Sequence, residues 1–201
     1  QDGAIKRIIF SKETEAEIAA LCSKLNGEPL EKTSNILNYL VANMFYEGTV
    51  RNYFYRHLPK KYMAAGALFF DEKDRILLVK PTYKPGWEIP GGIIEDNESP
   101  LEALGREIKE ELGLTINTPK TLCIQYVSNT DGKGERILFV FDGGVLTDKD
   151  IQSIKLPISE LSEYKFFTPD EALAFATGTL QSRIVQGVLA RKEKRVIYFE
   201  S

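Results

Sequence analysis

Apolar residues in the first part of the chain recur at the spacing of amphipathic helices. A Thr-x-x-Glu capping pattern begins at Thr14, and apolar side chains then follow at i, i+3, i+4 and i+7 until Gly27. A second, broader apolar face runs from about Thr33 to Tyr46. The pattern predicts a helical N-terminal extension over residues 1–60, followed by a second domain over residues 61–201.

The pattern changes after residue 60 to short apolar runs. Met63 to Phe70 is continuously apolar, which is typical of a strand buried on both faces. Further strands are expected at 75–80, 121–128, 136–141 and 195–199, and C-terminal helices at 168–176 and 180–192. These elements predict an α/β fold, a mixed sheet with helices on both faces in an α/β/α sandwich.

A long segment lies between the strand ending at Phe141 and the helix beginning at Thr168. Its apolar residues follow neither the spacing of a helix nor the alternation of a strand clearly. We expect a loop of about twenty residues there, and loops of that length are often functional. It carries two acidic residues, Glu160 and Glu163.

The segment from Trp87 to Leu114 contains the clearest local signals. Ser99 is placed to be an N-cap, with Pro100 at the first helical position and Glu102 three residues after the cap. Gly113 is placed to end the helix in the left-handed conformation. A helix is therefore expected between these residues.

Three carboxylates gather on one face of this expected helix, those of Glu107, Glu110 and Glu111. They lie near its C-terminal end, where each acidic side chain is unfavourable by roughly 0.3–1 kcal/mol. Glu107 and Glu111 also form a like-charged i,i+4 pair. Because hard divalent cations such as Mg²⁺ bind clustered carboxylate oxygens, the cluster indicates a metal site, although an anonymous acidic face is usually only solvated.

Glycines surround this acidic face. Gly91 and Gly92 allow the backbone to approach a ligand closely or to expose a carbonyl to a metal. Gly105, inside the helix, costs about 1 kcal/mol relative to Ala and suggests close packing against another element.

The segment resembles the Nudix box, the signature of the Nudix hydrolases. The fixed positions of that box are matched by Gly92, Glu98, Arg106, Glu107, Ile108, Glu110, Glu111, Gly113 and Leu114. The resemblance implies a Nudix-type fold from about residue 61 onward. It also implies a Mg²⁺- or Mn²⁺-dependent enzyme that hydrolyses a diphosphate bond in a nucleoside diphosphate linked to another group, such as a nucleotide sugar, ADP-ribose or a modified nucleotide.

The resemblance also implies roles for residues. It makes Glu107, Glu110 and Glu111 metal ligands, with the carbonyl of Gly91 a further ligand, and it makes Arg106 and Glu98 the pair that orients these carboxylates. Glu111 is our first choice for the general base, and Glu160 and Glu163 are the alternatives. Glu88 is a further candidate for a metal contact. Tyr83, Trp87 and Phe167 are candidates for stacking on a nucleobase, although each of these residue types is more often found in the core or at the rim.

Composition limits the partners. The net charge is −3, with 26 Lys and Arg against 29 Asp and Glu, which excludes the strongly basic footprint of a nucleic-acid binder. We find no signal peptide and no apolar run of about 20 residues, which predicts a cytoplasmic protein without membrane contact. Cys22 and Cys123 match no metal spacing and are expected to be reduced core residues. The apolar faces of the extension require cover, so a homodimer is predicted.

Two other functions remain open from the sequence. One is a sensor that binds a nucleotide or ADP-ribose without cleaving it. The other is a prenyl-diphosphate isomerase, which would require a catalytic cysteine near the site, and Cys123 is the candidate.

Overall fold

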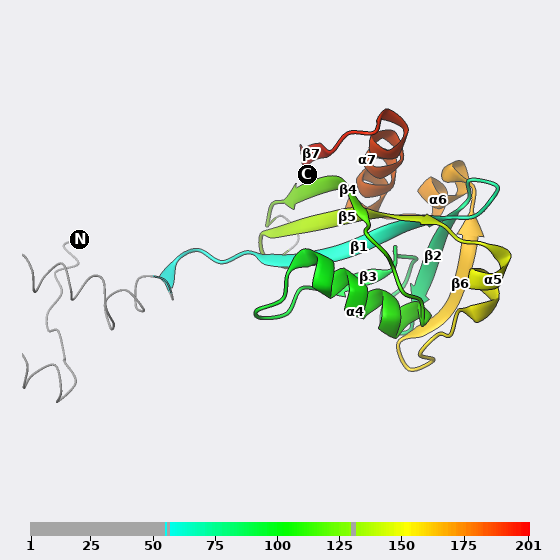
Figure 1. The fold of residues 1–201 in the computed structure, drawn as a ribbon. Helices are drawn as coiled ribbons and strands as arrows, with labels where there is room; N and C mark the ends of the chain where they lie inside the picture. The colour runs from blue at the N-terminus through cyan, green and yellow to red at the C-terminus, as the bar shows by residue number, and fades with distance from the viewer. Residues whose placement is uncertain (1–54, 56, 130–131) are drawn as a thin grey trace, which may run out of the picture. The chain divides into compact units, whose positions relative to one another are not determined.

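The structure is a computed structural model that describes residues 55, 57–129 and 132–201 (Figure 1). The expected helices of the N-terminal extension and Cys22 lie outside the described residues, so they stay predictions. The strands are β1 Tyr62–Phe70, β2 Ile76–Pro81, β3 Gly91–Ile93, β4 Lys120–Val127, β5 Arg136–Val145, β6 Leu161–Phe167 and β7 Ile197–Glu200. The helices are α4 Pro100–Leu112, α5 Asp148–Ser153, α6 Pro169–Phe175 and α7 Thr179–Glu193.

The strands form one mixed sheet in the order β6-β2-β1-β5-β4-β7, with β3 paired to β1 outside this path. The β1–β5 and β4–β7 pairs are parallel, and the other named pairs are antiparallel. Two apolar clusters fill the two faces. Ala103, Leu104, Ile108 and Leu112 of α4 are buried against one face, while Leu180, Ile184 and Ala190 of α7, together with Ala172 of α6, are buried against the other (Figure 1). The predicted α/β/α sandwich is confirmed.

Most elements begin and end within a few residues of their expected bounds. The prediction of a long loop after Phe141 is wrong. β5 continues to Val145 because it stays paired with β1 past a register shift at Leu68 and Phe69. Gly143 has no side chain where a Cβ would lie 2.5 Å from the Phe69 ring, so the Phe69 ring occupies that space. A capping box at Thr147 then begins α5, and β6 pairs antiparallel with β2.

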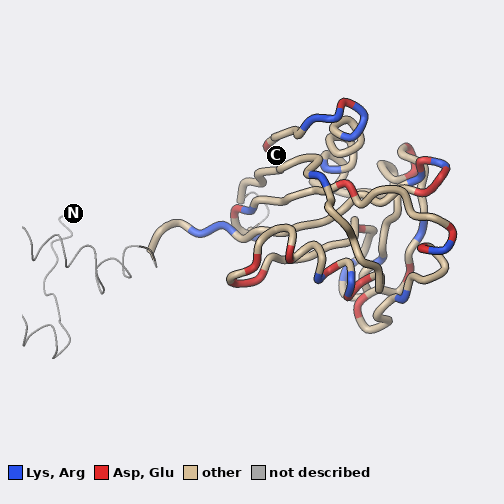
Figure 2. Tube along the Cα trace, in the orientation of Figure 1, with Lys and Arg blue, Asp and Glu red and all other residues tan. Residues whose placement is uncertain are grey.

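Acidic and basic residues are unevenly distributed along the chain (Figure 2). The last turn of α7 carries Arg191 and Lys192, as the partial negative charge at a helix C-terminus favours. Helix α4 instead ends in the carboxylates of Glu110 and Glu111, with Lys109 as the only basic residue of its last turn. Of the two long helices, α4 is therefore the one that violates the rule.

None of the helices described is long and apolar enough to span a membrane.

Candidate active site around helix α4

Helix α4 is fixed at both ends by the predicted caps. The Ser99 hydroxyl accepts from the Glu102 N–H, and the Glu102 carboxylate accepts from the Ser99 N–H at 2.8 Å. Gly113 ends the helix at φ 72°, and its N–H donates to the Lys109 carbonyl. Because the apolar stripe of α4 is buried against the sheet, the rotation of the helix about its axis is fixed, and so is the direction of its acidic face.

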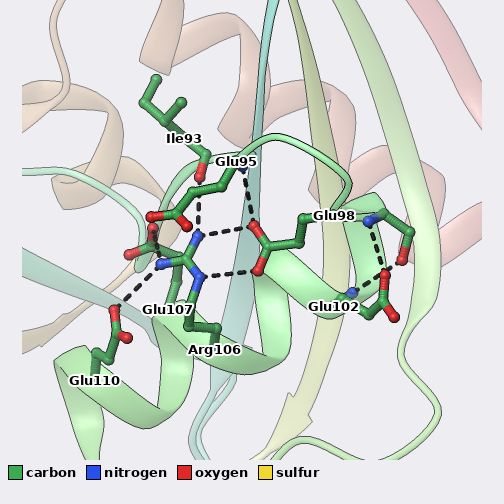
Figure 3. A network of polar contacts seen from close by, with 8 residues as sticks. Ile93, Glu95, Glu98, Glu102, Arg106, Glu107 and Glu110 are labelled. Carbon is green, nitrogen blue, oxygen red and sulfur yellow. Dashed lines mark hydrogen bonds and ion pairs between the residues drawn. The ribbon is translucent and has the colours of Figure 1, made fainter.

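The guanidinium of Arg106 forms hydrogen bonds and ion pairs with several of the acidic residues on and beside α4 (Figure 3). Arg106 Nε and Nη2 donate to the two oxygens of Glu98 at 2.9 and 3.0 Å, a bidentate pair. Its Nη1 donates to Glu107 Oε1 at 2.8 Å and to Glu110 Oε2 at 3.2 Å. Nη2 also donates to the Ile93 carbonyl at 3.1 Å, which ties α4 to β3. The hydrogen bonds to Glu98 and Glu107 raise the pKa of Arg106, so the charge is permanent.

Both glycines of β3 are required by close approaches. A Cβ on Gly91 would lie 2.2 Å from the Ala65 carbonyl oxygen, and φ at Gly91 is 137°, so a side chain is excluded there. A Cβ on Gly92 would lie 2.3 Å from Glu107 Oε1. The Gly-Gly pair thus lets the Glu107 carboxylate sit directly against the backbone of β3.

Glu111 is the carboxylate most withdrawn from water on this face. Its Oε2 accepts a hydrogen bond from the Gly91 N–H at 2.8 Å. Burial raises the pKa of Glu111 to about 7; the Gly91 hydrogen bond opposes the rise, and the charges of Glu107 and Glu160 add to it. Burial also raises the pKa of Glu107, although Arg106 opposes that shift. Two crowded carboxylates are therefore held where their negative charge is poorly compensated.

The donor set fits a hard divalent cation in chemistry but is not assembled around one. Carboxylate oxygens are the ligands that Mg²⁺ prefers, and the raised pKa values show that added positive charge would be favourable here. Among residues 55, 57–129 and 132–201, however, no three acidic, His or Cys side chains converge closely enough to hold a metal ion. Glu107 and Glu110 are turned toward Arg106 instead.

A cavity of about 580 Å³ opens beside Glu111. Gly91, Gly92 and Glu111 line it at the β3 and α4 side, and Thr179 and Arg183 of α7 line it from the other face of the sheet. Its volume lies in the range of about 300–1,000 Å³ that is usual for ligand sites. The cavity therefore connects the acidic cluster to a deeper space large enough for a small molecule.

The other acidic candidates lie in different positions. Glu160 immediately precedes β6, where its carbonyl accepts from the Thr82 N–H, and its charge contributes to the raised pKa of Glu111. Glu163 lies exposed on β6 opposite Lys80. Glu88 accepts from the Lys84 ammonium at 3.0 Å and lies on the cavity wall. Of the two alternative bases, Glu160 is thus the one that acts electrostatically on Glu111.

The three aromatic candidates separate clearly. Tyr83 is 75% exposed and lines the cavity. Phe167 is 1% exposed and belongs to the core, and Trp87 packs edge-on against it at 4.9 Å between ring centroids. Only Tyr83 of the three is placed at the cavity.

Two further expectations concern Gly105 and Cys123. A Cβ on Gly105 would meet no atom within 4 Å, so the expected close packing at this glycine is wrong. Cys123 is a free, fully buried thiol of β4, as predicted, and burial raises its pKa to about 12. A buried thiol of this kind does not support the hypothesis of a prenyl-diphosphate isomerase, which requires a catalytic cysteine.

Sequence reasoning missed Arg183, which lies on the cavity wall. A single Arg on an amphipathic helix has no pattern of its own, and only the position of α7 against the sheet shows where its side chain lies.

Comparisons with known proteins place most of the described domain in one family. The family model described as NUDIX domain matches residues 60–186. The 8-oxo-dGDP phosphatase of Mus musculus is 38% identical over 98 residues, which cover 45% of this chain and 29% of that protein. The 8-oxo-dGTP diphosphatase of Proteus vulgaris is 36% identical over 61 residues, covering 28% of this chain and 54% of that protein. The chain thus matches only about a third to a half of the length of these relatives.

A solved structure shows the same fold. The NUDIX domain of Shewanella oneidensis NrtR, complexed with ADP ribose, superposes with a TM-score of 0.57 at 19% identity, covering 73% of this chain and 99% of that one.

Proposed function

The chain belongs to the Nudix family, and on that premise we propose that it hydrolyses a diphosphate bond in a nucleoside diphosphate joined to a second group. The observation that carries the proposal is Glu111, a half-buried carboxylate that accepts from the Gly91 N–H, lines the cavity and is crowded by Glu107. A diphosphate repels a nucleophile because its oxygens are negative. The acidic cluster must therefore recruit positive charge before a water can attack.

The residues proposed to hold a divalent cation, Mg²⁺ or Mn²⁺, are Glu107, Glu110 and Glu111, with the Gly91 carbonyl as a further ligand. Such an ion would supply charge neutralisation for the diphosphate and polarise the attacking water. Arg106 Nη1 engages Oε1 of Glu107 and Oε2 of Glu110, so the second oxygen of each carboxylate lies outside these two hydrogen bonds and would be the one offered to an ion. Glu98 keeps Arg106 in place through its bidentate pair.

Glu111 is proposed as the general base that accepts the proton of the attacking water. Its position at the cavity edge supports this role, and the hydrogen bond from the Gly91 N–H fixes one of its oxygens. Glu160 is the alternative that the electrostatics favour, because its charge reaches Glu111. Glu163 is exposed on β6 opposite Lys80 and is not among the charges that raise the pKa of Glu111, so it is the weakest of the three candidates.

The proposed substrate is a small nucleotide. Two relatives carry the names of nucleotide phosphatases, and the Shewanella domain is complexed with ADP ribose. Tyr83, exposed at the cavity, offers a ring face on which a base or sugar can pack.

The test is a product assay on the full chain. ADP-ribose, UDP-glucose, 8-oxo-dGDP and 8-oxo-dGTP are incubated with Mg²⁺ or Mn²⁺, and release of phosphate, diphosphate and nucleoside monophosphate is measured. Cleavage of the diphosphate linkage in at least one substrate, abolished by a chelator, is expected. Absence of any cleavage across the panel would contradict the proposal.

One observation favours a second candidate, the non-catalytic sensor. Glu107 and Glu110 are engaged by Arg106, an arrangement that can bind a nucleotide without activating water. In that case the same panel would give saturable binding, measured by calorimetry, with no product.

A further inference from the structure

The deep wall of the cavity contains a guanidinium that the proposed chemistry does not use. Arg183 lies one helical turn after Thr179 at the start of α7, and both residues line the cavity. Its side chain is only 15% exposed, and its neighbour Ile184 is buried in the core. The charged group is thus directed inward, away from bulk water.

The contacts of Arg183 are too long to satisfy it. Its Nε lies 3.4 Å from the Thr179 carbonyl, and Nη2 lies 3.5 Å from the Thr179 hydroxyl. Among the described residues, the carboxylate within ion-pair distance is that of Glu88, at 3.9 Å from Nη2. Good hydrogen bonds of this kind are about 2.7–2.9 Å long. Within the described part of the chain, no closer acceptor for this guanidinium is found.

This arrangement is unfavourable for the charged side chain. Burial lowers the pKa of Arg183, which shows that the charged form is poorly compensated. Buried Arg side chains are normally paired with short, well-directed hydrogen bonds. Donors left in this state are suited to a ligand that completes the set.

We propose that Arg183 and Glu88 bind the hydrogen-bonding edge of the substrate's nucleobase, Arg183 donating to a ring carbonyl or ring nitrogen and Glu88 accepting from an adjacent N–H. The inference rests on the proposed function, since it assigns the base-binding end of the same cavity. The two side chains come from different elements, α7 and the segment after β2, and both line the cavity, so they can present a donor and an acceptor side by side to the edge of a flat ring.

The carboxylate beside Arg183 and the apolar wall favour a base over a second phosphate. Glu88 lies 3.9 Å from Arg183 Nη2 and also accepts from the Lys84 ammonium, so an anion bound at Arg183 would meet a negative group there. The neighbouring wall is apolar, formed by Ile89, Leu138 and Val140. Apolar walls with a few placed polar groups suit a neutral, planar ring. Bases present an acceptor next to a donor on one edge, which matches this pair.

The proposal gives Arg183 a role in specificity. A site built to hydrogen-bond a group rejects an analogue that lacks the group, because its own buried donors stay unpaired. Ligands without a base would therefore bind weakly, while the diphosphate would still be held at the Glu111 end of the cavity.

The test measures binding rather than turnover. The full chain is titrated by calorimetry with AMP, GMP, CMP, UMP and ribose 5-phosphate. At least one nucleoside monophosphate is expected to bind ten times or more tightly than ribose 5-phosphate. Arg183→Met should remove that preference by lowering the affinity for the nucleoside monophosphate about tenfold to a hundredfold. Loss of a hydrogen bond to a charged group typically lowers affinity by about that factor. Glu88→Gln should also weaken the nucleotide, and neither variant should change ribose 5-phosphate binding.

The control is Lys192→Met, an exposed residue of the same helix, which should leave all affinities unchanged. Arg183→Lys, which keeps the charge, should restore only part of the affinity, and thermal melts confirm that each variant is folded. Equal weakening of nucleotide and ribose 5-phosphate by Arg183→Met, or tighter binding of both by Glu88→Gln, would assign a phosphate to Arg183 and overturn the proposal. So would a wild type without preference for nucleotides. Because no cleavage is measured, failure here leaves the hydrolase assay to be judged separately.

Discussion

At the scale of single residues, Glu111 is the side chain on which the proposed chemistry depends. Glu111→Gln is nearly isosteric, keeps an acceptor for the Gly91 N–H, and removes a charge crowded by Glu107. We expect turnover to fall at least a hundredfold, within the range of about 10²–10⁴ attributed to general acid–base catalysis. The melting temperature without added metal should stay the same or rise. A variant with nearly full turnover on the best substrate would exclude Glu111 from the mechanism.

Asp71 allows a pH-dependent prediction far from the site. It is 6% exposed and accepts from the Lys73 and Arg75 N–H groups and from Arg75 Nε. Burial alone would raise its pKa, but the hydrogen bonds from Arg75 and Lys73 outweigh burial and lower it. The stabilisation is therefore complete above the unfolded pKa of about 3.9 and is lost as pH falls through the lower folded pKa.

Asp71→Asn is accordingly expected to lower the free energy of unfolding by about 1–3 kcal/mol at pH 7. The difference from wild type should be constant from pH 7 to pH 5 and should shrink below about pH 4. Urea unfolding at stepped pH measures it. A difference that persists unchanged at pH 3 would show that charge is not the cause.

At the scale of elements, the fit of β3 against α4 gives a matched pair of glycine variants. Gly92→Ala places a Cβ 2.3 Å from Glu107 Oε1, so the carboxylate must move, whereas Gly105→Ala meets no atom within 4 Å. We expect Gly92→Ala to reduce turnover at least tenfold. Gly105→Ala should keep turnover and gain about 0.5–1 kcal/mol in helix stability. Steady-state kinetics with denaturant unfolding separates them; equal turnover in both variants would show that the Gly92 contact is unimportant.

The elements also show what the sequence can predict. Helix α4 was predicted to the residue because Ser99, Pro100, Glu102 and Gly113 are local signals that act within one turn. The end of β5 was not, because Gly143 and Gly144 resemble a turn, and only the Phe69 ring and pairing with β1 explain them. Helix α5 has its own capping box at Thr147, a signal that was present but overlooked.

In the candidate site, too, features that depend on neighbouring residues in sequence could be predicted and those that depend on tertiary packing could not. The acidic cluster is contiguous in sequence and could be identified there, while the deep cavity wall is made by residues from separate elements. Phe167 was a candidate for stacking because aromatic type alone does not distinguish the two faces of β6. Pairing with β2 and contact with Trp87 place it in the core.

At the scale of the whole molecule, ion binding should be visible in the melting curve. An ion that binds only the folded form stabilises it by about 1.4 kcal/mol at ten times its dissociation constant. For a chain of this size that is a shift of about 3–5 °C. We expect Mg²⁺ and Mn²⁺ to give this shift at neutral pH, and Glu111→Gln to reduce it. Melting that is insensitive to both ions, against a KCl control of equal ionic strength, would favour a merely solvated acidic face.

The N-terminal sixty residues give the last prediction. Their sequence places Ile18, Leu21, Leu25, Ile36, Leu40 and Met44 on two apolar faces, larger than monomers usually leave uncovered. We predict that the full chain is a dimer through this extension. Sedimentation of the full chain beside a chain that begins at Lys60 should show a dimer and a monomer. A monomeric full chain, or a shortened chain that still dimerises, would contradict the prediction.

The bidentate ion pair between Glu98 and Arg106 bears on whether α4 can fold before a metal ion binds. Arg106 is a resident counter-ion for Glu107 and Glu110, so the acidic helix can form and pack before any metal arrives. The proposed divalent ion would then compete with a covalently tethered cation whose local concentration never falls.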